Sequence, residues 1–234
     1  MAQRAADTPG IALLHSPLVG PLCWQPLAER LRADGYRVIA PDLTAAAASD
    51  SHQGSFIAAA VHAIGVAEMG SVVLVGHSGA GPLLPAIASA ANTIGVIFVD
   101  AGLPHPGKSW FDTAPPPLTA HLKSLADHDG VLPRWSDWFD PAVLNEAIAD
   151  PRLRLRFVDE LPRLSICYFE QPTPATVWDG PTAYLQLSAV YIADADRAAA
   201  AGWPVQRLPE GHLAILTAPQ HVLPALIALL EAVG

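Results

Sequence analysis

Residues 71–81 read SVVLVGHSGAG and indicate the fold of this chain more clearly than any other segment. Its first half is a short apolar run of the kind that forms a buried strand. Its second half places Ser78 between the small residues Gly76 and Ala80. A serine on a sharp strand-to-helix turn needs small neighbours, because strand and helix approach each other closely there. The stretch therefore predicts a nucleophile elbow, in which the N–H of Gly79 and the start of the next helix favour a negative charge near the serine.

Length and composition indicate one domain built around a single core. The chain has 234 residues, 51% of them hydrophobic, and its formal net charge is −9. So acidic a chain is not expected to bind nucleic acid or an anionic membrane surface. We expect no N-terminal leader, because residues 1–10 contain no long apolar run, and no membrane span, because the chain lacks an unbroken run of ~20 apolar residues. We expect one domain over residues 1–234, located in the cytoplasm. We expect small molecules as its partners, and no cofactor or metal. The oligomeric state stays open.

The two cysteines, Cys23 and Cys167, lie far apart in the sequence. Their spacing fits no metal site, and apolar or aromatic residues flank each of them. Cysteines in such surroundings behave as small hydrophobic residues. We therefore expect two buried free thiols, which fits a reducing compartment.

Apolar runs bounded by turn residues alternate with helical patterns along most of the chain. Such alternation is typical of a parallel sheet covered by helices on both faces. Besides the strand before Ser78, we expect strands over residues 11–14, 36–40, 94–99, 183–188 and 204–208. We expect helices over residues 22–33, 55–69, 81–91, 194–201 and 220–232. The fold class that follows is α/β, with a mostly parallel, doubly wound sheet.

The alternation breaks from about residue 104 to residue 180, where prolines, tryptophans and short helical pieces replace it. We expect helices over 118–127, 141–149 and 153–161, and we interpret the segment as a small helical cap inserted into the domain. Bulky aromatic side chains pack a small cap onto its body, and some of them are expected to line an apolar pocket. The candidates for substrate binding are His77, His105, Trp110, Trp138 and Tyr168.

A serine is a poor nucleophile near neutral pH, and it needs a base within hydrogen-bond reach. His212 is the best candidate for this base, because it follows the last expected strand in residues 209–213, which read PEGHL. A loop at that place reaches the carboxyl edge of a parallel sheet, where the elbow also lies. The alternative is a loop histidine with no partner.

Three motifs together resemble the α/β-hydrolase superfamily over essentially the whole length of the chain. Residues 15–20 read HSPLVG and lead to Trp24, as in an oxyanion loop; residues 76–79 read GHSG, as in an elbow; residues 99–104 read VDAGLP, as in the segment that enters a cap. The motifs are similar to those of the small-capped branch that holds plant-type esterases and hydroxynitrile lyases. The resemblance implies an α/β-hydrolase fold and a serine nucleophile, and it leaves the reaction open because the fold supports many chemistries.

The acid that orients the histidine has two candidates. In most of the superfamily the acid follows the strand expected here over 183–188, but this chain has Tyr191 near that position. Asp194 comes a little later, where an acidic residue also suits the start of a helix. Asp100 ends the preceding strand, at the place where relatives such as haloalkane dehalogenases carry their acid. We expect Asp100 to orient His212, with Asp194 as the alternative and a purely structural Asp100 as the third possibility.

The oxyanion loop departs from the pattern of the family. Relatives usually offer a backbone N–H two residues past the position of His15, but this chain has Pro17 there, which carries no N–H. Loss of one donor costs on the order of 3 kcal/mol of transition-state stabilisation. We expect the N–H of Leu18, from a shifted loop, to join that of Gly79 as the second oxyanion donor.

The leading functional interpretation is a serine hydrolase. Ser78 would attack a small to medium apolar carboxylic ester, thioester or related acyl compound and form an acyl-enzyme, with His212 carrying the proton. The altered oxyanion loop keeps a second interpretation open, a lyase or carbon–carbon bond cleaving enzyme that uses the same serine and histidine. A third is a ligand-binding sensor with slow or no turnover.

Overall fold

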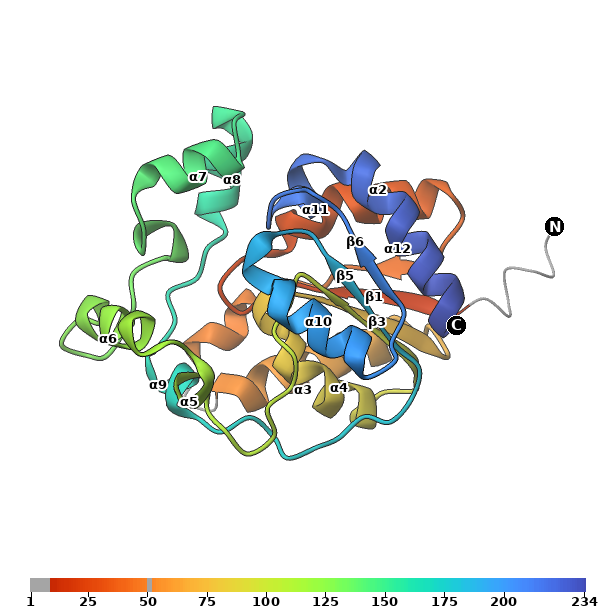
Figure 1. The fold of residues 1–234 in the computed structure, drawn as a ribbon, viewed down its shortest axis with the longest axis horizontal. Helices are drawn as coiled ribbons and strands as arrows, with labels where there is room; N and C mark the ends of the chain where they lie inside the picture. The colour runs from red at the N-terminus through yellow and green to blue at the C-terminus, as the bar shows by residue number, and fades with distance from the viewer. Residues whose placement is uncertain (1–8, 50–51) are drawn as a thin grey trace.

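The computed structural model describes residues 9–49 and 52–234. Within these residues, six strands form one sheet in the order β2-β1-β3-β4-β5-β6, and every neighbouring pair is parallel. The strands are β1 (Gly10–Leu14), β2 (Val38–Ile39), β3 (Val72–His77), β4 (Thr93–Val99), β5 (Thr182–Gln186) and β6 (Val205–Arg207). The expected α/β fold with a parallel, doubly wound sheet is confirmed (Figure 1). The expectation about an N-terminal leader falls largely on residues 1–8, outside the described part of the chain.

The sheet is covered on both faces because its central strands are apolar at nearly every position. Every residue of β1 and of β3 is buried. Side chains alternate across a strand, so that Ile11 and Leu13 of β1 pack into one layer while Ala12 and Leu14 pack into the other. Such continuous apolar strands are typical of parallel sheets with helices on both faces.

Helices cover each face of the sheet. On one face lie α2 (Gln25–Ala33), α11 (Ala214–Thr217) and α12 (Pro219–Val233). On the other lie α3 (His52–Val66), α4 (Leu84–Ala90) and α10 (Ile192–Ala200). Figure 1 shows the two groups above and below the strands. In the described ranges, none of the helices is both long enough and apolar enough to span a lipid bilayer.

Prolines decide where the helix after the elbow begins. The helix expected over 81–91 starts as a 3-10 helix, η3 (Ser78–Leu83), and becomes the α-helix α4 only at Leu84. Pro85 then lies in the first turn of α4, where its missing N–H costs no intrahelical hydrogen bond. Other 3-10 helices are η1 (Pro21–Trp24), η2 (Thr44–Ala48) and η5 (Ala189–Tyr191).

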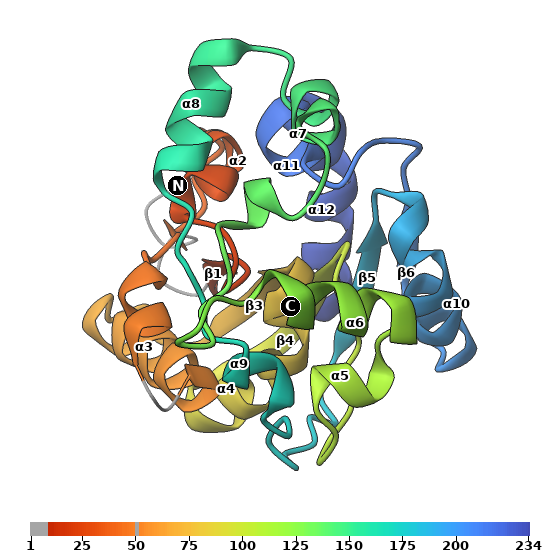
Figure 2. The same cartoon turned by 90° about the vertical axis from the view of Figure 1, so that its left-hand side faces the viewer.

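A helical segment occupies residues 104–180, where the sequence predicts short helices. It contains α5 (Trp110–Thr113), α6 (Pro116–Leu125), η4 (Trp135–Asp137), α7 (Pro141–Ala147), α8 (Pro151–Asp159) and α9 (Cys167–Glu170). Figure 1 and Figure 2 show these pieces together on one side of the sheet. Glu160, just past α8, accepts the N–H of Leu22 at 2.8 Å, which joins the helical segment to the chain that follows β1.

One expectation about the cysteines is wrong. Both are free thiols and Cys23 is buried, but Cys167 is exposed. Cys167 begins the short helix α9, whose buried side is provided by Tyr168 and Phe169, so the cysteine side chain is left toward solvent. Burial raises the pKa of the Cys23 thiol.

Candidate active site

The sharp turn that the sequence predicts forms where β3 meets η3. Ser78 directly follows β3 and has a φ of 56°, in the left-handed region that strains a residue with a side chain. Packing requires the small residues around it. A Cβ on Gly76 would lie 2.8 Å from the side chain of Leu84. A Cβ on Gly81 would lie 2.1 Å from the carbonyl oxygen of Gly102.

A second strained residue, Asp100, follows β4 with a φ of 43°. Its side chain is fully buried. Oδ1 accepts the N–H groups of Leu187 and Ser188 at 2.8 and 2.9 Å, and Oδ2 accepts the Ser188 hydroxyl at 2.6 Å. Burial alone would raise the pKa of this carboxyl, but hydrogen bonds from His212 and Ser188 outweigh it and lower the pKa. Asp100 is therefore a buried carboxylate that is kept ionised by its hydrogen bonds.

His212 joins these two residues from the loop between β6 and α11. Its Nδ1 lies 2.7 Å from Asp100 Oδ2, and its Nε2 lies 3.1 Å from Ser78 Oγ. Because a carboxylate only accepts, Nδ1 carries the proton and Nε2 accepts the proton of the Ser78 hydroxyl. The His212 side chain is 24% exposed, so a ligand has access to the imidazole although the Asp100 carboxylate behind it is buried. The three residues expected to form a catalytic triad thus make one hydrogen-bonded chain, and their roles in a reaction remain predictions.

Asp194, the alternative acid, lies elsewhere. Its Oδ1 accepts the N–H of Leu103 at 3.0 Å, and its carboxylate pairs with Arg197 in α10. Within the described residues, no hydrogen bond joins Asp194 to His212. The geometry therefore favours Asp100 as the partner of the histidine.

The loop after β1 carries the expected second oxyanion donor. The buried, neutral imidazole of His15 holds this loop, because Nδ1 donates to the Ser16 carbonyl at 2.8 Å and Nε2 accepts the N–H of Leu43 at 2.9 Å. The N–H of Leu18 donates to Ser16 Oγ at 3.3 Å. A Cβ on Gly79 would lie 2.8 Å from that same oxygen, so the Ser16 hydroxyl lies beside Gly79 as well as beside the N–H of Leu18. Leu18 can serve an oxyanion only by exchanging this long hydrogen bond for one to a substrate.

His77, at the elbow, packs against His212. Its imidazole stacks on that of His212 with ring centroids 4.5 Å apart, and its Nε2 lies 3.0 Å from the His212 carbonyl oxygen. Burial, and then the charge of His212, lower the pKa of His77 to about 3. The ring is therefore neutral and donates its Nε2–H to that carbonyl. The structure shows His77 against His212, and its expected contact with substrate stays a prediction.

The buried neutral ring of His77 makes the protein sensitive to mild acid. Its pKa is about 3 in the folded chain against an ordinary value of 6.5, so between those values the unfolded chain binds a proton that the folded chain does not. The stability that depends on the neutral ring is complete above pH 6.5 and is lost as the pH falls toward 3. The lowered pKa of His15 acts in the same direction. The lowered pKa of Asp100 changes the stability only at pH values below about 3.8, the ordinary pKa of an aspartate.

Urea unfolding should show a free energy of unfolding about 2 kcal/mol lower at pH 5 than at pH 7. Tryptophan fluorescence is a suitable readout, because the chain has six tryptophans. His77→Gln should reduce the difference between the two pH values, since a glutamine does not titrate. Equal unfolding free energies of the wild type at the two pH values would contradict the prediction.

Tyr191 belongs to this site, although the sequence does not single it out as functional. Its hydroxyl oxygen lies 3.4 Å from Ser78 Oγ, and its ring stacks on that of His212 with centroids 5.4 Å apart. The one signal in the sequence is position: Tyr191 falls near the place where most of the superfamily carries its acid.

The aromatic residues expected to bind substrate pack against one another in the helical segment. Phe169 is the centre of the group, with the rings of Trp110, Trp138 and Tyr168 at centroid distances of 5.2, 5.9 and 5.2 Å. Trp138 and Tyr168 are buried. His105 is half-buried in the loop after β4, and burial lowers its pKa. This packing fits aromatic residues that form the core of a small segment, and ligand contact stays a prediction for all four candidates.

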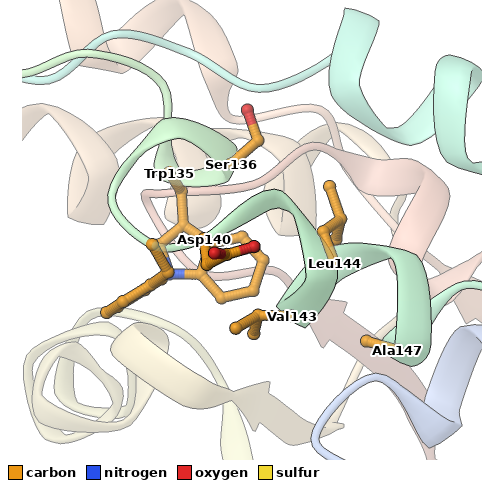
Figure 3. A pocket seen from close by; sticks show the side chains of 7 residues that line it. Trp135, Ser136, Asp140, Val143, Leu144 and Ala147 are labelled. Carbon is orange, nitrogen blue, oxygen red and sulfur yellow. The ribbon is translucent and has the colours of Figure 1, made fainter.

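Two hollows lie away from the triad residues. One, of about 20 Å³, opens between η4 and α7 and has room for a water molecule rather than a substrate. Figure 3 shows its lining, Trp135, Ser136, Phe139, Asp140, Val143, Leu144 and Ala147. The other is an open groove of about 450 Å³ beside α3 and β2, lined by Arg32, Ile39, Ala40, Pro41, His62, Ala63, Val66 and Ala67. Neither lining includes a residue expected to bind substrate.

One surface group within the described residues has the composition of a metal site. Asp127, His128 and Asp129 are exposed, with ligand atoms within 4.8 Å of one another. Asp127 already accepts backbone N–H groups of its own loop and the Arg163 guanidinium, the latter at 2.6 Å. These bonds explain the position of Asp127 without an ion.

Fold and site together define the class of protein: a parallel α/β sheet with a serine on a strained turn, and an aspartate and a histidine that follow other strands of the same sheet. The chain belongs to the alpha/beta hydrolase family, whose sequence profile matches residues 11–225. The family resemblance found in the sequence is thereby confirmed.

Several proteins are similar to this chain over nearly their whole length. A carbendazim hydrolyzing esterase of Nocardioides sp. (strain SG-4G) is 25% identical, covering 93% of this chain and 98% of that protein. Among solved structures, a pyrethroid hydrolase of Sphingobium faniae has a TM-score of 0.69 at 23% identity, covering 96% of this chain and 98% of the other. Tomato methylketone synthase I with 2-tridecanone has a TM-score of 0.69 at 14% identity, covering 97% of this chain and 99% of the other. At these identities the two structures show a shared fold.

Proposed function

We propose that this protein is a serine hydrolase that cleaves a small to medium apolar carboxylic ester, thioester or related acyl compound through an acyl-enzyme on Ser78. One observation carries the proposal, the hydrogen-bonded chain from Asp100 through His212 to Ser78. Two of its three members have strained backbone conformations. Strain and a buried charge both cost stability, and they cluster where a site uses them.

In the proposed reaction, Ser78 Oγ attacks the carbonyl carbon while His212 Nε2 takes the serine proton. Asp100 holds the imidazole in the required tautomer and stabilises the imidazolium that forms. The N–H of Gly79, at the start of η3, donates to the oxyanion. The bond to the leaving group then breaks as His212 returns the proton to it. Water, deprotonated by the same histidine, releases the acid and restores Ser78.

The relatives and the helical segment support an apolar small molecule as the substrate. One relative is named for the hydrolysis of carbendazim and another for that of pyrethroids. We infer that residues 104–180 form a cap within a single domain. Its aromatic side chains Trp110, Trp138 and Tyr168, with His105 at its base, would give the acyl or leaving group apolar contacts. The proposed reaction uses no cofactor and no metal.

Covalent labelling followed by turnover tests the proposal. The mass of the intact protein is measured after exposure to a fluorophosphonate, and the labelled peptide is located. A series of 4-nitrophenyl esters of increasing acyl length then defines the preferred acyl group. Prompt labelling of Ser78 together with ester turnover supports the hydrolase. Labelling without turnover of any ester points instead to a ligand-binding sensor, and absence of labelling contradicts a nucleophilic serine.

A lyase or carbon–carbon bond cleaving enzyme is the second candidate, and the oxyanion loop favours it. Pro17 removes one backbone donor, and the N–H of Leu18 is engaged with Ser16 Oγ at 3.3 Å. A site with one free oxyanion donor suits proton movement by His212 better than acyl transfer. Product formation without a serine-bound intermediate would distinguish this chemistry.

Ser16→Ala tests the expected role of Leu18. Removal of the hydroxyl frees the Leu18 N–H to face the substrate, so kcat should stay within about threefold of the wild type. A loss of about a hundredfold would show instead that the hydroxyl of Ser16 itself stabilises the oxyanion. Steady-state hydrolysis of one 4-nitrophenyl ester is sufficient. Circular dichroism of both proteins provides the control for folding.

A further inference from the structure

Tyr191 places a second hydroxyl beside the nucleophile. It ends η5, the turn that follows β5, and its hydroxyl oxygen lies 3.4 Å from Ser78 Oγ. Its ring stacks on the imidazole of His212, with an angle of 21° between the two ring planes. The tyrosine therefore approaches Ser78 from the side on which the histidine lies.

The Tyr191 hydroxyl is a hydrogen-bond donor without a good acceptor. Burial raises the pKa of Tyr191 to about 12, so the hydroxyl keeps its proton where a histidine acts as a base. Among the described residues, its hydrogen-bond partner is Ser78 Oγ, and 3.4 Å is long for two hydroxyl groups, which prefer about 2.7 Å. A donor held so loosely can turn to a better acceptor at little cost.

The proposed reaction creates such an acceptor. As Ser78 Oγ bonds to the carbonyl carbon and the bond from that carbon to the leaving oxygen breaks, negative charge builds on the leaving oxygen until His212 Nε2 protonates it. The leaving oxygen must lie within reach of Nε2, and hence on the histidine side of the tetrahedral centre. The Tyr191 hydroxyl approaches from that side.

We propose that Tyr191 is a further catalytic residue, which donates a hydrogen bond to the leaving-group oxygen as its bond to carbon breaks. The inference rests on the proposed hydrolase function. The proton that the leaving group gains comes from His212, and Tyr191 keeps its own proton throughout. The benefit is selective, because an alkyl alcohol leaves as a strong base and needs the donor, whereas a nitrophenol leaves as a weak base and needs it little.

The test compares two esters that share an acyl group, 4-nitrophenyl butyrate and ethyl butyrate. For Tyr191→Phe, kcat/KM should fall by less than about tenfold on the nitrophenyl ester and by about a hundredfold on the ethyl ester. Tyr36→Phe is the matched control, because Tyr36 precedes β2 at the amino-terminal edge of the sheet, away from the elbow. Equal losses on the two esters, or no loss on either, would overturn the role of Tyr191.

Tyr191→Leu separates hydrogen-bond donation from orientation of the base. The phenylalanine variant keeps a ring against His212, and the leucine variant removes it. If the tyrosine only orients the histidine, Tyr191→Phe matches the wild type on both esters while Tyr191→Leu fails on both, and the proposal is wrong. A wild type that hydrolyses neither ester and whose Ser78 resists a fluorophosphonate overturns the hydrolase function as well. If the wild type hydrolyses the esters and its Ser78 is labelled, a negative result for the variants contradicts only the role of Tyr191 and not the hydrolase function.

Discussion

Ser78→Ala should lower kcat/KM for every hydrolysed ester by about 10⁴-fold to 10⁶-fold, the loss typical of removing the nucleophile from a triad. The substitution removes only the attacking oxygen from a half-buried turn and opens no cavity in the core. The free energy of unfolding should therefore change by less than ~1 kcal/mol. Ester hydrolysis measures the first effect, and urea unfolding measures the second.

His212→Ala is the companion variant, and the double variant is the sharper test. Because the serine and the histidine act as one unit, removing both should cost little more than removing either. Losses that multiply in the double variant would show that the two residues act independently. A Ser78→Ala protein that keeps about a tenth or more of the wild-type activity would exclude an acyl-enzyme on this residue.

The sequence predicts those residues of the candidate site that follow the ends of strands. Ser78 and Asp100 follow β3 and β4, and His212 follows β6, so a parallel sheet brings all three to its carboxyl edge. A sequence pattern that predicts the strands therefore also predicts where these three residues lie. The choice between Asp100 and Asp194 needs the structure, because it depends on which carboxylate reaches His212: Asp100 does, whereas Asp194, in α10, accepts the N–H of Leu103.

Sequence patterns do not predict the contacts that side chains make across loops. Tyr191 reaches Ser78 because η5 turns its ring onto His212, and no spacing in the sequence encodes that turn. The engagement of Leu18 with the Ser16 hydroxyl depends in the same way on loop geometry. Exposure of Cys167 depends on which side of a one-turn helix is buried, and periodicity cannot be measured over four residues.

The second large effect is expected from Asp100→Asn, which should lower kcat/KM by about 10⁴-fold. In the wild type, Oδ1 accepts two backbone N–H groups, and Oδ2 accepts the Ser188 hydroxyl and His212 Nδ1–H. An asparagine keeps its oxygen toward the two N–H groups and therefore presents its NH₂ to the histidine. Nδ1 must then accept, which moves the imidazole proton to Nε2. In that tautomer Nε2 cannot take the proton of Ser78.

Asp194→Asn is the matched control for this substitution, since it makes the same chemical change at the rejected candidate. Its remaining oxygen can still accept the N–H of Leu103, so kcat/KM should stay within about threefold of the wild type. Both variants are compared with the wild type in ester hydrolysis and in thermal unfolding. A large loss for Asp194→Asn with a small one for Asp100→Asn would transfer the orienting role to Asp194. Small losses for both would mean that His212 and Ser78 work as a dyad, with a buried Asp100 that serves only to hold the loop after β5.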